Sequence, residues 1–111
     1  MSERMTDSEK KKILGIFEAF SSEVRLDIFR LLVTCEPDGL VAGEISGKLS
    51  ISPTNLSFHL KTLSHAGLLT VLPQGRFIRY RARVDQALWV VDYLTENCCH
   101  NQPDRCAPEK S

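Results

Sequence analysis

The feature that most constrains the fold is a change in the spacing of apolar residues at Gly67. Before this glycine, apolar side chains recur three or four residues apart, most clearly as Leu56, Leu60 and Leu63, which is the spacing of one helix face. After it, in residues 76–84, polar and apolar side chains alternate, as they do along a β-strand with one buried face. The chain is therefore predicted to place helices first and a β-hairpin after them.

Capping residues and turn formers divide the first part of the chain into four helices. The turn sequence at residues 37–39 ends the second helix. Ser52 is a suitable N-cap for the fourth helix, and Pro53 suits its first position, where no backbone N–H is needed. The sequence Ala66-Gly67 closes that helix. The predicted helices cover residues 7–20, 23–34, 42–49 and 53–65.

The hairpin is expected to expose a row of arginines. Its strands, residues 68–72 and 76–84, are joined by a predicted turn at residues 73–75. Because side chains alternate between the two faces of a strand, the apolar ones of the second strand should pack on the helices. These inward residues are Ile78, Tyr80, Ala82 and Val84. The outward ones are Arg79, Arg81 and Arg83.

The final helix, predicted over residues 85–97, is too apolar for one small domain to cover. Every residue from 87 to 94 except Asp92 is apolar, so this helix is expected to face both the core and a second subunit. The first helix adds another apolar face, and a chain of 111 residues cannot bury both alone. We therefore predict a two-fold homodimer. Its predicted interface comprises Ile13, Phe17, Phe20, Leu88, Trp89, Val91 and Tyr93.

Charge is segregated along the chain, although the chain as a whole is neutral. The net charge is −3 for residues 1–44, +6 for residues 45–84 and −3 for residues 85–111. The middle stretch has no Asp or Glu, which would repel a phosphate backbone, and its basic side chains are suited to neutralising phosphates. Nucleic acid is therefore the expected partner.

Helices followed by a hairpin, in the order α-α-α-α-β-β-α, predict a winged helix-turn-helix, a mainly α fold with a β-hairpin wing. In this fold the fourth helix can enter a major groove, and the wing can lie along the adjacent backbone or minor groove. Lys61 suits a phosphate contact, whereas His59 and His65 are of a type more often packed or solvated than base-reading. The predicted residues that bind double-stranded DNA are Ser52, Thr54, Asn55, Ser57, Phe58, His59, Lys61, Arg76, Arg79 and Arg81.

Three segments carry a family resemblance. The run from residue 52 to 69, SPTNLSFHLKTLSHAGLL, resembles the recognition-helix segment of the ArsR/SmtB family of winged-helix repressors. Residues 22–28, SEVRLDI, resemble the opening of that family's second helix, and residues 75–80, GRFIRY, resemble its wing. The resemblance covers about residues 10–97. It implies a homodimer built on the first and last helices, an inverted-repeat operator, and release from DNA when an inducer binds.

The sensing sites of that family direct attention to the end of the chain. Residues 40–45 lack the Cys-x-Cys pair of many arsenic sensors, and the last helix lacks the His of a zinc site. Residues 98–106 instead resemble the C-terminal thiol site of an arsenite- and antimonite-responsive subgroup. Trivalent arsenic and antimony are soft and prefer thiolates, and the short loop of residues 100–105 costs little entropy to close. The predicted metalloid ligands are Cys98, Cys99 and Cys106.

The chain is thus predicted to comprise a DNA-binding and dimerisation domain, residues 1–97, and a cysteine-containing tail, residues 98–111. Cys35 stands apart from the tail and is expected to be a small buried hydrophobe. The N-terminus has no secretory signal and no apolar run is long enough for a membrane helix, so a cytoplasmic protein is expected.

Three functions remain open on the sequence. The favoured one is a repressor that dissociates from its operator when the tail binds As(III) or Sb(III). The second is a winged-helix repressor with a thiol redox switch, through disulfides or persulfides, or a zinc-responsive variant that recruits His100. The third is a winged-helix module that binds protein, against which the arginine row and the missing acids argue. No enzyme is expected, because no nucleophile–base pair or phosphate loop is recognisable.

Overall fold

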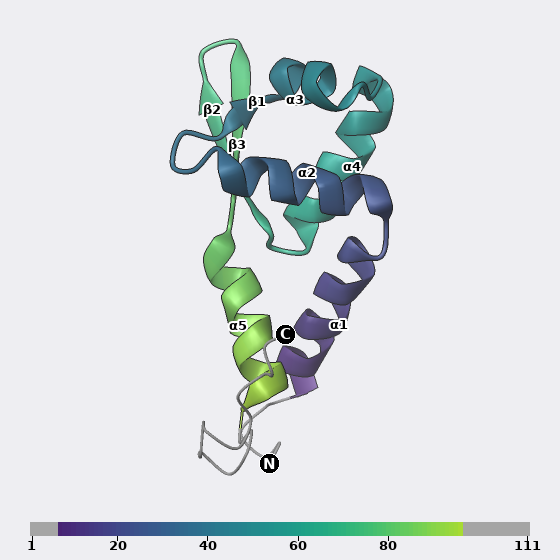
Figure 1. Cartoon of the computed structure of the whole chain (residues 1–111), viewed down its shortest axis with the longest axis vertical. Helices are drawn as coiled ribbons and strands as arrows, with labels where there is room; N and C mark the ends of the chain where they lie inside the picture. Colours follow the sequence, from purple (N-terminus) through teal and green to yellow (C-terminus); the bar gives the residue numbers. More distant parts are fainter. Residues whose placement is uncertain (1–6, 97–111) are drawn as a thin grey trace, which may run out of the picture.

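The computed structural model describes residues 7–96, which form helices at both ends of a small sheet (Figure 1). The elements are α1 (Asp7–Phe20), α2 (Glu23–Thr34), β1 (Leu40–Val41), α3 (Ala42–Leu49), α4 (Pro53–His65), β2 (Leu69–Gln74), β3 (Phe77–Ala82) and α5 (Val84–Thr95). This architecture confirms the winged helix-turn-helix. All four helices predicted before the hairpin have the predicted bounds. None of the helices in residues 7–96 has the length and apolar character that a membrane crossing requires.

The wing belongs to a three-stranded antiparallel sheet rather than to an isolated hairpin. Its central strand is β3, which pairs with β2 from Leu69–Ala82 to Gln74–Phe77 and with β1 at Leu40–Tyr80. The sequence pattern does not predict β1, because a strand of two residues is too short to show alternation. The observed order is therefore α-α-β-α-α-β-β-α, with one strand more than predicted.

The predicted turn at residues 73–75 is wrong. Strand β2 continues through Pro73 and Gln74, and the turn consists of Gly75 and Arg76. Pro73 is tolerated because β2 is an edge strand, where a missing backbone N–H need not break the ladder. Gly75 adopts a φ of 61°, which two-residue hairpin turns commonly require.

The predicted ends of the second wing strand and of the last helix also differ from the structure. Strand β3 stops at Ala82, Arg83 is the N-cap of α5, and Val84 is the first residue of that helix. Arg83 and Val84 therefore do not continue the alternation of the strand. Helix α5 ends at Thr95, two residues before the predicted end.

One hydrophobic core joins α1 to α4 and the base of the sheet. Leu56, Leu60 and Leu63 lie in it as predicted, each at most 3% exposed. Burying a Leu or Ile side chain of this kind contributes about 1.5–3 kcal/mol. The fully buried members are Ile16, Ile28, Leu32, Ile45, Leu56, Leu63 and Leu68. In Figure 1 α1 and α5 extend from this body and approach each other at their far ends.

Candidate nucleic-acid interface

Helix α4 is oriented by its cap and its buried stripe. The Ser52 hydroxyl accepts a hydrogen bond from the Asn55 backbone N–H at 3.2 Å, and Pro53 occupies the first turn. With three leucines buried, the opposite face of the helix is left to solvent. That exposed face carries the predicted residues Thr54, Asn55, Ser57, Phe58 and Lys61. Their contact with DNA stays a prediction, but they lie together on one accessible surface.

A groove of about 780 Å³ separates this face of α4 from the wing. Its apolar part is lined by Phe58 of α4 and by Val71 and Tyr80 of the sheet. Phe58 is 70% exposed, which is unusual for an aromatic side chain in a small monomer. The remaining lining is Pro53, Thr54, Ser57, Leu60, Lys61, Ser64 and His65. The groove thus combines hydroxyls and a cation with an exposed aromatic ring.

His59 does not lie on the exposed face of α4. It is half-buried, and its Nδ1 lies 3.3 Å from a terminal nitrogen of Arg25 in α2. Arginine has no acceptor, so the imidazole accepts this hydrogen bond. Arg25 also donates through Nε to the Ala19 carbonyl oxygen at 2.7 Å. This geometry corrects the prediction that His59 contacts DNA, and makes it a link between α2 and α4.

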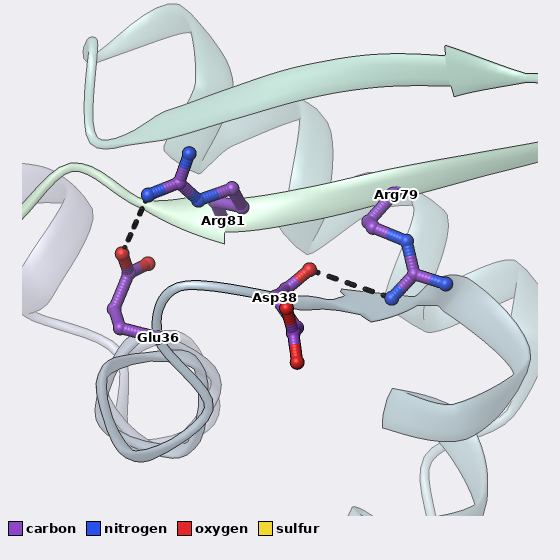
Figure 2. Close-up of polar contacts among 4 residues, drawn as sticks. All are labelled: Glu36, Asp38, Arg79 and Arg81. Carbon is purple, nitrogen blue, oxygen red and sulfur yellow. Dashed lines mark hydrogen bonds and ion pairs between the residues drawn. The ribbon is translucent and has the colours of Figure 1, made fainter.

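The wing arginines do not form the free outward row that alternation predicts. Arg79 donates through Nε to Gln74 Oε1 at 2.9 Å and through a terminal nitrogen to the Gly39 carbonyl oxygen at 3.2 Å. Arg81 forms an ion pair with Glu36 at 2.8 Å. Figure 2 shows both side chains reaching from β3 to the segment between α2 and β1. Two predicted DNA contacts are therefore occupied within the chain.

Arg83 is occupied as well, although outside the sheet. It pairs with Asp85 in the first turn of α5 at 2.8 Å, and this hydrogen bond lowers the pKa of the Asp85 carboxyl. The Glu36 carboxylate, by accepting a hydrogen bond, raises the pKa of Arg81 above its usual value. Carboxylates from either side of the acid-free stretch thus fold back onto its arginines. Within residues 7–96, the cations of this stretch that lack such partners are Lys48, Lys61 and Arg76.

The apolar faces of α1 and α5 divide into a packed part and an exposed part. Ile13, predicted at a dimer interface, is 3% exposed and belongs to the core. Phe20 is half-buried and stacks edge-on against Phe29, with ring centroids 5.1 Å apart. Trp89 and Tyr93 also pack partly on the core. The exposed apolar side chains of the two helices are Leu14, Phe17, Leu88, Val91 and Leu94.

Leu14 and Leu94 are absent from the predicted interface. Leu14 lies three residues before Phe17, and Leu94 lies three residues after Val91. Helical spacing places each on the same face as its exposed neighbour, so this spacing is the signal that could have identified both.

The predicted metalloid ligands Cys98, Cys99 and Cys106 lie outside the described residues. Between residues 7 and 96, no group of three or more His, Cys, Asp or Glu side chains is placed to hold a metal ion. Cys35 is the C-cap of α2, is half-buried and packs against the core. Its Sγ lies 3.8 Å from Thr34 Oγ1. The prediction of a buried hydrophobe is thus correct for its packing but not for full burial.

Comparison with known proteins identifies the family. Residues 20–71 match the model of a helix-turn-helix domain. The chain is 38% identical over 72 residues to YceK of Bacillus subtilis (strain 168), an uncharacterized HTH-type transcriptional regulator, which spans 65% of this chain and 71% of YceK. The chain belongs to the HTH-type transcriptional regulators.

Solved structures place this regulator in the ArsR-like winged-helix type. An ArsR-like transcriptional regulator from Rhodococcus sp. RHA1 is similar over 90% of this chain and 91% of its own, with 26% identity and a TM-score of 0.71. Reduced HlyU from Vibrio cholerae N16961 is similar over 84% and 95%, with 25% identity and a TM-score of 0.64. A homodimeric winged helix-turn-helix DNA-binding domain from Mycobacterium bovis shares the fold at 20% identity over 88% and 90%, with a TM-score of 0.67.

Proposed function

We propose that this regulator is a homodimeric repressor in the cytoplasm that binds an inverted-repeat operator with one α4 helix in each of two major grooves. The observation that carries the proposal is the exposed face of α4, which combines Asn55, Ser57, Phe58 and Lys61 beside an open groove. Asparagine and serine can hydrogen-bond base edges, a Phe ring can contact thymine methyl groups, and Lys61 suits a phosphate. At the tip of the wing, Arg76 is exposed and positioned for a second phosphate.

The proposed dimer interface is the exposed apolar surface of α1 and α5. Leu88, Val91 and Leu94 of α5 are each more than half exposed, and Leu14 and Phe17 of α1 add to the same kind of surface. Burying such side chains in a second copy would remove apolar area that the monomer leaves in water. The homodimeric domain from Mycobacterium bovis has the same fold, which supports this assembly.

Binding to short duplexes at several salt concentrations tests the proposal. Lys61→Ala should weaken binding to all sequences and flatten the dependence on salt, because a phosphate contact carries no sequence information. Asn55→Ala and Ser57→Ala should instead reduce the preference for the operator over other duplexes. Binding that ignores salt, with Lys61→Ala equal to wild type, would refute the placement of α4 on DNA.

We further propose that the inducer is As(III) or Sb(III), bound by the thiolates of Cys98, Cys99 and Cys106. The support comes from the sequence: three thiols within nine residues, directly after the last helix, and a resemblance to arsenite-responsive repressors. A soft trivalent metalloid is satisfied by three thiolates in a pyramidal site. Since α5 contributes to the proposed dimer interface, a ligand at its end is in a position to alter the spacing of the two α4 helices.

Anaerobic arsenite titration of the protein–operator complex tests this sensor. Cys98→Ser, Cys99→Ser and Cys106→Ser should each keep operator binding but impair its release, and sulfur coordination of bound arsenic should be threefold. Cys35→Ser is the matched control, because its thiol packs against the core at the end of α2. Wild-type release by the Cys98→Ser/Cys99→Ser double variant would exclude the tail as the sensor.

A thiol redox switch is the second candidate, and its specific support is the likeness to a structure described as reduced HlyU. The same thiols could form a disulfide or a persulfide, and a zinc-responsive variant would add His100. Release of operator by an oxidant in the absence of metalloid, reversed by a thiol reductant, would favour this function over metalloid sensing. Release by zinc alone would favour the variant.

A further inference from the structure

The segment between α2 and β1, residues 35–39, lies directly against strand β3. The α2 helix itself contacts β3, and β1 pairs with it immediately after this segment. Gly39, with a φ of 71°, faces the Tyr80 backbone so closely that a Cβ atom would collide with the Tyr80 carbonyl. The approach is thus one that only glycine allows at this position.

Two arginines of β3 hold this segment from above (Figure 2). Arg79 donates through one terminal nitrogen to the carbonyl oxygens of Asp38 and Gly39, at 3.4 and 3.2 Å. Arg81 donates to Glu36 Oε1 at 2.8 Å. We call this set, Glu36, Asp38 and Gly39 with Arg79 and Arg81, the wing clip.

The ion pair of the wing clip is partly withdrawn from water. The side chains of Arg81 and Glu36 are 38% and 27% exposed. Glu36 Oε2 and Arg81 Nε are shielded from solvent and find no hydrogen-bond partner in the described residues. Removing one partner would therefore leave polar atoms of the other shielded and unpaired, which disfavours the clipped arrangement.

The clip grips the wing between its anchored base and its free tip. At the base, Leu69 and Ala82 are opposite each other and buried. At the tip, Gln74 and Phe77 are opposite each other and exposed, and Arg76 lies in the turn between them. Whatever fixes β3 at its middle also fixes the direction in which the tip points.

We propose that Arg79 and Arg81 are positioning residues: they clip the wing to the end of α2 so that Arg76 at its tip reaches the DNA, and they do not themselves bind phosphate. This inference rests on the proposed function, in which α4 and the wing contact operator DNA. It extends that function by assigning Glu36, an acid outside the basic stretch, a supporting role in DNA binding.

The clip and a phosphate contact predict opposite effects for Glu36→Gln. If Arg81 bound phosphate, removing the neighbouring carboxylate would free the guanidinium and tighten binding. If Arg81 positions the wing, the same change loosens the clip and weakens operator binding, by about three- to tenfold for a dimer with two wings. Asp85→Asn is the matched control, since it also removes a carboxylate that pairs with an arginine, here Arg83, but outside the sheet.

The test measures operator affinity for Glu36→Gln, Arg76→Ala and the double variant, with thermal unfolding and backbone NMR spectra to verify the fold. We expect Glu36→Gln to weaken binding in the wild-type background but not in the Arg76→Ala background, because the clip acts through the tip. NMR shift changes should concentrate in residues 36–39 and 77–81. The charge-exchanged double variant Glu36→Arg/Arg81→Glu should regain affinity relative to Arg81→Glu alone.

Three outcomes would overturn the clip: unchanged or tighter binding by Glu36→Gln, a loss equal to that of Asp85→Asn, or a loss that persists in the Arg76→Ala background. An Arg76→Ala variant with wild-type affinity would instead refute the proposed tip contact, and the clip with it. Failure of Lys61→Ala to weaken binding would count against the proposed placement of α4, which the clip experiment leaves separate.

Discussion

The recognition helix α4 and the wing differ in what determines the direction of their polar side chains. In α4, local spacing is sufficient: three buried leucines fix one face, and the residues between them are exposed. In the wing, the arginines alternate as expected along the strand, yet their partners lie about forty residues earlier in the chain. A pattern of period 3.6 or 2 gives a side chain's face but not the group that meets it there.

The largest expected effect separates the two faces of α4. Leu63→Ala should destabilise the protein by about 2–5 kcal/mol, because Leu63 is fully buried and its truncation leaves a cavity. Phe58→Ala, on the exposed face, should change the free energy of unfolding by no more than about 0.5 kcal/mol. Urea unfolding measures both. A large loss for Phe58→Ala would show that its ring is packed, and the contrast between the faces would fail.

The next effect tests whether the exposed part of α5 is an interface. Val91→Glu should dissociate the dimer, since Val91 is 54% exposed in the monomer and would meet a second copy. Operator affinity should fall on the order of a hundredfold, because the two half-sites would then be bound independently. Analytical ultracentrifugation and operator titration check the two steps. The control is Asp92→Asn at the neighbouring exposed position, which should leave the protein dimeric.

A smaller effect compares the cations of α4 and the wing tip with those of the clip. Lys61→Ala and Arg76→Ala should each lower the slope of log affinity against log salt by about 1.8 per dimer, which is 0.9 for each phosphate released. Arg83→Ala should change this slope little, because its guanidinium already pairs with Asp85. Titrations at four or more salt concentrations suffice. Equal slopes for all variants would mean that none of these side chains meets a phosphate.

Most of the fold was accessible from the sequence, and the parts that were not have identifiable causes. Caps such as Ser52 and the glycine after α4 define helix ends locally, so the bounds of the first four helices agree. The turn at residues 75–76 depends on Pro73 lying on an edge strand, which is known only once the sheet order is known. Strand β1 likewise exists only through its pairing with β3.

The candidate site shows the same division. The exposed residues of α4 follow from its buried stripe, whereas His59 is turned toward Arg25 of another helix, 34 residues away in sequence. Similarly, Glu36 and Asp38 neutralise a stretch that contains no acid of its own. Contacts of this range are tertiary, so no local count of charges reveals that two of the predicted phosphate ligands are already occupied.

The smallest expected effect concerns the Arg83–Asp85 pair at the start of α5, which is the exposed counterpart of the clip. The hydrogen bond from Arg83 lowers the pKa of Asp85 in the folded protein below its unfolded value of about 3.9. The pair therefore adds stability above that pH and loses it as the pH falls through the lowered pKa. Asp85→Asn should lower the melting temperature slightly at pH 7, and the difference from wild type should vanish toward pH 2. The side chain of Asp85 is 65% exposed, so solvent screens the pair, and its loss should matter less than that of the Glu36–Arg81 pair. A larger loss at pH 7 for Asp85→Asn than for Glu36→Gln would reverse this order, and would make the start of α5 rather than the clip the stronger constraint on the end of β3.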